Sequence, residues 1–223
     1  MLPKISTISI DGPVAAGKSA VGTLLAARLG YRFIDTGMMY RSVTWAVINK
    51  QVDLEDEEAV TNIANQTIIE VGTGENPDIR VDGENVAGQL RTRSVEQGVS
   101  RISRFLGVRT AMVSRQRLLG ANGNIIMAGR DIGTVVLPDA DLKIFLTASA
   151  EERARRRHQE ILGSGQNIAF DQVLQDLRQR DKLDTERTNS PLKPAEHSTI
   201  LNTDNIELTD VVDQIINLMG NLE

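Results

Sequence analysis

Residues 12–19 of this 223-residue chain read Gly-Pro-Val-Ala-Ala-Gly-Lys-Ser, which fits the pattern G-x-x-x-x-G-K-[ST]. The pattern restricts the fold strongly, because its mechanism needs a β-strand before it and a helix after it. Both are predicted: β-branched and small residues alternate over 4–10, and apolar residues recur at helical spacing over 18–29. The glycines let backbone N–H groups turn toward a phosphate, and the helix N-terminus adds positive potential. Residues 12–19 are therefore predicted to be a phosphate-binding loop.

The rest of the chain alternates strand-like and helical segments, which is typical of an α/β fold with a parallel sheet. The apolar runs at 124–128 and 142–147 indicate buried central strands. Shorter strands are predicted at 31–35 and 199–201. Helices are predicted at 37–49, 96–103, 107–119, 150–162, 170–182 and 208–219.

Residues 63–95 have a different pattern. Short strand-like segments at 67–71, 79–81 and 84–87 are separated by turn signals at 72–77 and 82–83. These segments contain too few apolar residues to form a core of their own. We therefore predict a small antiparallel insert within a single domain of residues 1–223.

Composition excludes several classes of function. The net charge of −5 argues against binding to a nucleic-acid polymer, which usually needs a basic surface. The absence of cysteine excludes disulfides and thiolate metal sites, and two histidines are too few for a histidine-rich zinc site. No apolar stretch approaches the roughly 18 residues of a membrane span, and residues 1–10 are too polar for a signal peptide. We expect a cytoplasmic monomer without a membrane or nucleic-acid partner.

Further sequence features separate the classes of protein that carry such a loop. The guanine-reading string Asn-Lys-x-Asp is missing, since its nearest match at 49–52 ends in Val52. Motor-like ATPases carry an apolar run ending in Asp-Glu, whereas 125–131 reads IIMAGRD. A small-molecule kinase is favoured, in which Lys18 reaches the β- and γ-phosphates of ATP and the Ser19 hydroxyl ligates Mg²⁺. The expected ATP-binding residues are Gly12, Pro13, Val14, Ala15, Ala16, Gly17, Lys18, Ser19 and Ala20.

Arginine is abundant in the second half of the chain. A phosphate acceptor with a second pKa of about 6 is already a nucleophile at pH 7, so the protein must position anions and neutralise charge. Arginine suits this task, because its planar fork of donors matches phosphate oxygens. Arg153 and Arg157 are four residues apart and are predicted on one helical face. The alternative is a solvated face paired with Glu151, Glu152 and Glu160.

Four further strings occur in order along the chain. They are Ile10-Asp11-Gly12-Pro13; Asp35-Thr36-Gly37 with Tyr40-Arg41; Gly129-Arg130-Asp131-Ile132-Gly133-Thr134-Val135-Val136 with Pro138-Asp139-Ala140; and Arg180-Asp181 with Asp184, Arg187 and Pro191-Leu192. Together they resemble the bacterial cytidylate kinase family, from about residue 4 to about residue 215. The third string is far more selective than the phosphate-binding loop.

The resemblance implies a nucleoside monophosphate kinase fold with a parallel five-stranded core. It also implies transfer of the γ-phosphoryl group of ATP to CMP or dCMP. The core is expected at 1–62, 96–150 and 171–223, the β insert on the monophosphate side at 63–95, and a mobile helical lid at 151–170. Two residues depart from the family pattern: Thr36 stands where serine is expected, and Ala20 stands where a hydroxyl residue is common.

The resemblance further assigns roles to particular residues. Ser100, Arg109 and Asp131 are expected to face the cytosine, and Arg153 and Arg157 to act from the lid. The implied CMP-binding residues are Thr36, Tyr40, Arg41, Ser100, Arg109, Arg130, Asp131, Arg180, Asp184 and Arg187. The implied catalytic residues are Lys18, Arg130, Arg153, Arg157, Arg180 and Arg187.

The residues alone leave alternatives open. In one alternative, the chain is a kinase for UMP or another small acceptor. In the other, it binds nucleotide without turnover. Asp131 follows an apolar strand at the sheet edge where α/β folds bind ligands, so it contacts the cytosine amino group or instead pairs with Arg130. Tyr40 contacts the acceptor or packs in the core. Asp35 is a candidate carboxylate in the outer shell of the Mg²⁺.

Overall fold

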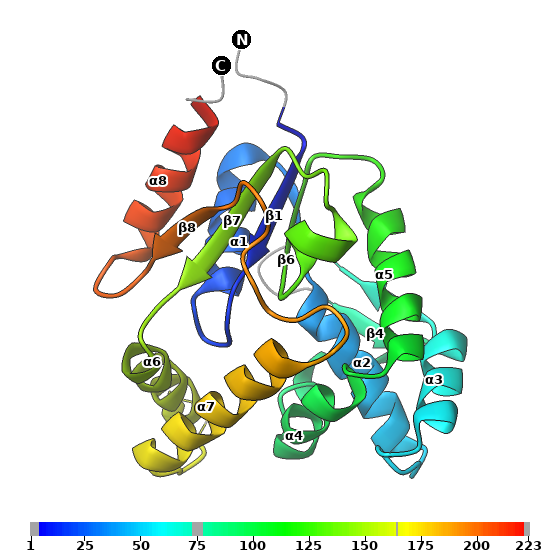
Figure 1. Ribbon diagram of the computed structural model, residues 1–223. Coiled ribbons are helices and arrows are strands. Elements are labelled where there is room, and N and C mark those ends of the chain that lie inside the picture. Colours follow the sequence, from blue (N-terminus) through cyan, green and yellow to red (C-terminus); the bar gives the residue numbers. More distant parts are fainter. Residues whose placement is uncertain (1–4, 73–77, 164, 221–223) are drawn as a thin grey trace.

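The computed structural model describes residues 5–72, 78–163 and 165–220 of the chain. A sheet of five parallel strands lies at its centre, in the order β2-β6-β1-β7-β8 (Figure 1). The strand that leads into the phosphate-binding loop is the middle one. The strands are β1 (Thr7–Asp11), β2 (Arg32–Asp35), β6 (Ile125–Gly129), β7 (Leu142–Thr147) and β8 (Thr199–Asn202).

Different helices cover the two faces of the sheet, because successive side chains of a strand point to opposite faces. Ile8 and Ile10 of β1 pack with helices α1 and α8, whereas Ile125 and Met127 of β6 pack with α2 and α5. Both sets are fully buried, so the sheet is the middle of three layers. The helices are α1 (Lys18–Leu29), α2 (Thr36–Asn49), α3 (Glu57–Gln66), α4 (Arg93–Ile102), α5 (Leu106–Gly120), α6 (Ala150–Gly163), α7 (Phe170–Glu186) and α8 (Leu208–Gly220).

A second, antiparallel sheet is formed by β3 (Ile69–Val71), β4 (Ile79–Val81) and β5 (Glu84–Asn85). Ile79 and Val81 are buried in the same cluster as the core-facing residues of α2, α3 and α5. The sheet thus has no core separate from that of the main domain. Of the turn predicted at 72–77, residues 73–77 lie outside the described part of the chain.

Three elements were not predicted from the sequence. Helix α3 begins after Asp56, whose carboxylate accepts a hydrogen bond from Ala59 N at 3.0 Å, a normal N-cap. The segment Ile132–Val136 forms one turn of π-helix, η2, directly after β6 and Asp131. A short 3₁₀ turn, η1 (Ala87–Gln89), precedes α4. The predicted strands and the other helices are confirmed to within four residues at each end.

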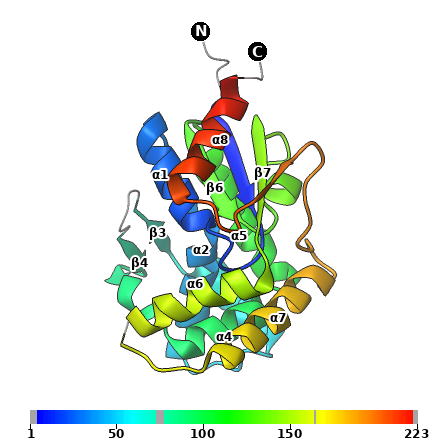
Figure 2. The same cartoon turned by 90° about the vertical axis from the view of Figure 1, so that its left-hand side faces the viewer.

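The carboxyl ends of the parallel strands meet at one edge of the main sheet. Helices α6 and α7 lie across this edge, and α4 lies near them (Figures 1 and 2). In an open α/β sheet, ligands bind outside this edge. No helix in the described ranges is long and apolar enough to cross a membrane.

Candidate active site

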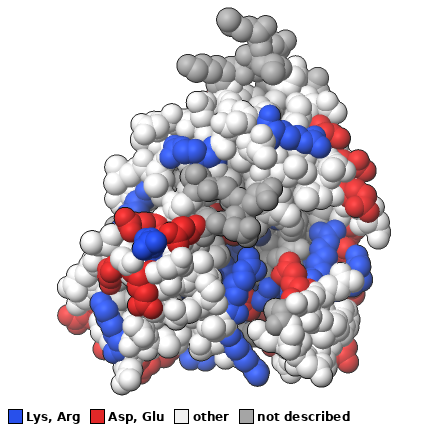
Figure 3. All heavy atoms as spheres, turned by 180° about the vertical axis from the view of Figure 1, so that it is seen from behind, with Lys and Arg blue, Asp and Glu red and all other residues white. Residues whose placement is uncertain are grey.

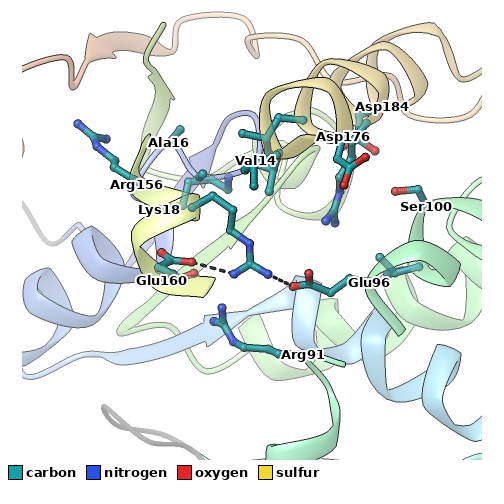
Figure 4. A pocket seen from close by; sticks show the side chains of 18 of the residues that line it. Val14, Ala16, Lys18, Arg91, Glu96, Ser100, Arg156, Glu160, Asp176 and Asp184 are labelled. Carbon is teal, nitrogen blue, oxygen red and sulfur yellow. Dashed lines mark hydrogen bonds and ion pairs between the residues drawn. The ribbon is translucent and has the colours of Figure 1, made fainter. Parts of the chain in front are cut away.

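A cleft of about 2220 Å³ opens at the carboxyl edge of the sheet. The phosphate-binding loop, α2, α4, α5, the end of β6, α6 and α7 line it (Figure 4). The molecule seen from behind is hollowed, and Lys and Arg side chains gather at the hollow with some acidic ones among them (Figure 3). The residues predicted for the site all line this cleft except Gly12, Pro13 and Arg153.

The phosphate-binding loop needs glycine at its two ends. Gly12 has φ +148°, and a Cβ there would lie 2.1 Å from the carbonyl oxygen of Leu146. Gly17 has φ +90° and is the N-cap residue of α1, so the helix N-terminus opens into the cleft. The sequence of small residues therefore lets the backbone approach an anion closely.

Lys18 is the first residue of α1, and its side chain is buried in the loop. Its Nζ donates a hydrogen bond to the carbonyl oxygen of Pro13 at 2.6 Å. Burial, helped by the nearby Arg130, lowers the pKa of Lys18 well below its usual range, while Asp35 and Asp11 oppose the shift. An added anion would favour the charged form of Lys18, so this group is suited to bind phosphate.

Ser19 and Asp35 place two hard oxygen ligands side by side. Ser19 Oγ donates a hydrogen bond to Asp35 Oδ2 at 2.7 Å, and Asp35 Oδ1 accepts one from Gly37 N at 2.9 Å as the N-cap of α2. The described residues contain no cluster of three or more His, Cys, Asp or Glu that fits a metal ion. This donor set fits Mg²⁺, which usually takes one or two protein ligands and fills its shell with phosphate and water oxygens.

A chain of alternating charges crosses the acceptor side of the cleft. Arg109 pairs with Asp131, and Asp131 Oδ1 lies 3.7 Å from Arg187 Nη2. Arg187 Nη1 lies 4.0 Å from Asp184 Oδ1, and Asp184 Oδ2 accepts a hydrogen bond from Arg130 Nε at 2.8 Å. Burial opposes the ionisation of Asp184, but Arg130 and Arg180 outweigh it and lower its pKa. The partner of Arg130 is thus Asp184 and not its sequence neighbour Asp131.

Three arginines that line the cleft each have a buried N–H group without a hydrogen-bond partner. Among the described residues, Arg41 Nε, Arg180 Nε and Arg187 Nη2 have no hydrogen-bond partner. Burial lowers the pKa of Arg41, and burial with the nearby Arg130 lowers the pKa of Arg180 to about 10. Unpaired guanidinium N–H groups are costly to bury, so their common position in one cleft indicates an anion site.

Thr36 and Tyr40 lie at the start of α2, beside this cluster. The Thr36 hydroxyl donates to the carbonyl oxygen of Ala128 at 2.8 Å, and so ties α2 to β6. The Tyr40 ring is almost wholly buried, and the guanidinium carbon of Arg109 lies 5.6 Å from its centre. Burial raises the pKa of Tyr40 to about 12. Tyr40 therefore belongs to the core and to the cleft wall at once.

The two predicted lid arginines have different environments. Arg153 is buried, pairs with Asp181 of α7 at 2.7 Å and donates to the carbonyl oxygen of Val14 at 3.1 Å. It therefore connects α6, α7 and the phosphate-binding loop outside the cleft lining. Arg157 lines the cleft and pairs with Glu96 of α4 and with Glu160 of its own helix.

Sequence analysis missed three residues at or behind the cleft. Glu96 lines it, and Arg156 lines it with hydrogen bonds from Nη1 and Nη2 to Thr203. Asp11 lies behind it, and its carboxylate accepts hydrogen bonds from Ile132 N and Gly133 N, each at 2.8 Å. Burial raises the pKa of Asp11 to about 6, although these hydrogen bonds oppose the shift. The only signal for Asp11 was its place before the loop, and nothing in the sequence pointed to Glu96.

Comparisons with known proteins agree with this geometry. Residues 8–221 match the family model described as Cytidylate kinase. A cytidylate kinase of Bacillus pumilus (strain SAFR-032) is 44% identical over 223 residues, which are 100% of this chain and 99% of the relative. A cytidylate kinase of Geobacillus sp. (strain WCH70) is 43% identical over 214 residues, which are 96% of this chain and 96% of the relative.

A solved structure shares the fold at low sequence identity. The shikimate kinase from Acinetobacter baumannii in complex with shikimate has a TM-score of 0.51 and 17% identity, and the match covers 99% of this chain and 96% of that chain. At this identity the likeness shows the fold alone. The predicted α/β fold, with a parallel five-stranded sheet and a small antiparallel sheet, is confirmed.

Proposed function

The chain belongs to the cytidylate kinase family, and we therefore propose that its cleft binds ATP at one end and CMP or dCMP at the other. The reaction is transfer of the γ-phosphoryl group of ATP to the phosphate of CMP or dCMP, which yields ADP and CDP or dCDP. One observation carries this assignment: Arg41, Arg180 and Arg187, each with an N–H group that lacks a hydrogen-bond partner, line the same cleft as the phosphate-binding loop. Such donors are suited to bind the phosphate of the acceptor beside the phosphates of ATP.

The donor nucleotide binds along residues 12–20. The backbone N–H groups of the loop hold the phosphates, and Lys18 exchanges its contact with the Pro13 carbonyl for the β- and γ-phosphate oxygens. Ala20 offers no hydroxyl, so its contribution to ATP binding is through the backbone.

The acceptor binds between α2, α4 and α5. Its phosphate lies among Arg41, Arg130 and Arg180, since Arg130 is close enough to the other two to help lower their pKa. The base lies toward Asp131, with Ser100 lining the same region. Asp131 accepts a hydrogen bond from the cytosine amino group, and its ion pair with Arg109 orients the carboxylate. Arg187 joins the base region to the phosphate region, since it lies near both Asp131 and Asp184.

The chemistry requires positioning and charge neutralisation. An oxygen of the acceptor phosphate attacks the γ-phosphorus, the bond from that phosphorus to the β-phosphate oxygen breaks, and ADP leaves. The acceptor phosphate is largely ionised at pH 7, so no general base is needed. Lys18, Arg130, Arg157 and Arg180 stabilise the charge on the transferring group.

Ser19 and Asp35 would hold Mg²⁺, which when bound would supply charge neutralisation for the phosphates of ATP. Ser19 would ligate it directly, and Asp35 would orient Ser19 or a bound water. This assignment rests on the 2.7 Å contact between a hydroxyl and a carboxylate at the loop, together with the chemistry of the two groups.

We further propose that 151–170 moves as a lid and that 63–95 belongs to the monophosphate side, with the remainder of the chain as the core. Arg157 then acts from the lid, whereas Arg153 ties the lid helix α6 to α7 of the core through Asp181. One chain supplies every residue of this site, so we propose a monomer. The absence of cysteine suits the reducing cytoplasm, where we propose that it acts.

The test is phosphate transfer to a panel of acceptors. ADP release is measured with CMP, dCMP, UMP and AMP at fixed ATP and Mg²⁺. We expect kcat/KM to be highest for CMP or dCMP. Equal or greater turnover of UMP or AMP would overturn the acceptor assignment, and ATP binding without any turnover would indicate a nucleotide-binding module.

A further inference from the structure

An ion pair joins the two walls of the cleft. Glu96 lies on α4, one helical turn before Ser100, and its carboxylate accepts a hydrogen bond from Arg157 of α6. The two side chains retain only 24% and 15% of their exposure, so the pair is largely screened from water. The second partner of Arg157 is Glu160, at 2.8 Å and one turn along the same helix. Figure 4 shows Glu96 and Glu160 on opposite sides of the pocket, each joined by a dashed line to the guanidinium between them.

Glu96 differs from Glu160 in its surroundings. Glu160 is 56% exposed and joins two residues of one helix, whereas Glu96 connects different helices across the cleft. Burial lowers the pKa of Arg41 and of Arg180, and Glu96 is among the carboxylates that oppose this shift in both. Glu96 thus lies near Arg41, Arg157 and Arg180 of the cleft. A cluster of arginines of this kind also favours the binding of a phosphate group.

We propose that Glu96 is an internal counter-ion that competes with nucleotide phosphates for Arg157 and so weakens nucleotide binding. The inference rests on the proposed kinase function, in which Arg157 contacts the transferring phosphoryl group. A phosphate that binds the Nη2 group of Arg157 competes with Glu96, which already accepts a hydrogen bond from it. The carboxylate also repels a phosphate that enters among Arg41, Arg157 and Arg180. Glu96 therefore sets nucleotide affinity and positions Arg157 before nucleotide binds.

The decisive experiment compares Glu96→Gln with Glu160→Gln. Both changes remove one negative charge next to the same guanidinium and keep the shape of the side chain. We expect Glu96→Gln to lower the KM for at least one of the two nucleotides, ATP or CMP, about tenfold. The kcat should rise by a smaller factor than that by which KM falls. Glu160→Gln should change KM less than about twofold, because that carboxylate is exposed and its ion pair lies within one helix. A gain in affinity is a result that damage to the fold cannot produce.

A second pair of variants tests whether Glu96 acts through Arg157. In the background of Arg157→Gln, the change Glu96→Gln should lower KM less than about threefold, since the competing partner is already gone. Glu96→Ala gives the same comparison if the glutamine variant does not fold. An unchanged or raised KM in Glu96→Gln, or equal effects of Glu96→Gln and Glu160→Gln, would overturn the proposal.

Failure of the function itself gives a different result. The wild-type enzyme is assayed first with ATP, Mg²⁺ and CMP. Absence of phosphate transfer in the wild type overturns the kinase assignment and this inference with it. Normal transfer in the wild type, followed by an unaltered KM in Glu96→Gln, overturns only the role of Glu96.

Discussion

Asp131 forms its ion pair with Arg109, 22 residues away in the sequence, and not with the adjacent Arg130. Both side chains are buried, at 4% exposure for Arg109 and 7% for Asp131. Arg109 also donates hydrogen bonds from Nε to Ser190 Oγ at 3.1 Å and from Nη1 to the Ser103 carbonyl oxygen at 3.2 Å. A buried guanidinium fixed in this way holds the Asp131 carboxylate in one orientation at the cleft.

This relationship predicts how Asp131 selects the base. Cytosine offers an amino group to a carboxylate, whereas uracil presents a carbonyl oxygen that the carboxylate repels. Asp131→Asn removes the charge and can donate to that carbonyl. We expect kcat/KM for CMP to fall about tenfold or more, and the ratio of CMP to UMP turnover to fall further. Steady-state assays with both acceptors measure the ratio.

Asparagine is the informative substitution, because Asp131→Ala would leave the buried Arg109 without its carboxylate partner, at a cost of about 3–5 kcal/mol in the free energy of unfolding. Asp139→Asn, an exposed residue outside the cleft, is the control and should leave the ratio unchanged. An unaltered CMP-to-UMP ratio in Asp131→Asn would show that Asp131 does not read the base.

The sequence determined the main strands but not the choice of ion-pair partners. Apolar, β-branched runs such as 142–147 correspond to β7 residue for residue, since a buried strand leaves a local signal. The pairing of Arg109 with Asp131 depends on how α5 packs near the end of β6. No local pattern encodes that packing, so sequence reasoning considered Arg130 as the partner of Asp131.

Arg153 is a second residue whose contacts could not be predicted from the sequence. A spacing of four residues places Arg153 and Arg157 on one helical face, but it does not say which of them reaches the cleft. In the structure Arg153 points to Asp181 and Val14, one turn away from the cleft position of Arg157.

Helix α3 was missed for a different reason. Its cap at Asp56 and the acidic residues Glu57 and Glu58 are signals of a helix N-terminus, but they were not interpreted as such.

A prediction for Lys18 follows from its burial in the loop. Lys18→Ala should lower kcat by about 100-fold or more, because it removes a preorganised charge from the transferring phosphoryl group. The free energy of unfolding should not fall, since the burial of a charged amine is costly in itself. Lys50→Ala removes an exposed lysine outside the cleft and should leave kcat unchanged. Near-normal turnover by a folded Lys18→Ala variant would contradict the assignment of the loop.

The contact between Ser19 and Asp35 predicts a defect in metal use. EDTA should abolish activity, and added Mg²⁺ should restore it. Asp35→Asn keeps the N-cap of α2 but removes the charge, so it should raise the free Mg²⁺ needed for half-maximal activity. Asp56→Asn makes the same change at the cap of α3, away from the cleft, and serves as the control. Identical Mg²⁺ curves for the two variants would exclude a role of Asp35 in metal binding.

The proposed lid predicts a change in hydrogen exchange. Helix α6 lines the cleft, so closure on both nucleotides should slow amide exchange within 151–170. The measurement compares the free enzyme with the enzyme bound to a bisubstrate analogue. Strand β7 (Leu142–Thr147), central in the sheet, provides the internal reference. Exchange that slows equally in both segments would indicate general stabilisation without a lid.

Asp11 predicts a dependence of stability on pH. Burial raises its pKa from 3.8 to about 6. Between pH 3.8 and about pH 6, Asp11 is therefore protonated in the folded state and ionised in the unfolded state. The stability that this group contributes is therefore complete below about pH 4 and disappears as the pH rises through about 6. Relative to Asp11→Asn, which cannot titrate, the free energy of unfolding of the wild type should fall by up to about 3 kcal/mol from pH 4 to pH 7.

Urea unfolding of both proteins at several pH values measures this difference, and the comparison cancels the other titrating groups. Asp141 is the contrasting control, because four hydrogen bonds from the backbone and side chains of Ser6 and Thr7 outweigh its burial and lower its pKa. Its contribution is complete above the unfolded value and is lost only as the pH falls through the lower folded value. The difference between wild type and Asp141→Asn should therefore stay nearly constant above pH 4.5 or so. A constant difference for Asp11→Asn as well would show that the pKa of Asp11 is not raised, because its two hydrogen bonds from Ile132 N and Gly133 N offset its burial.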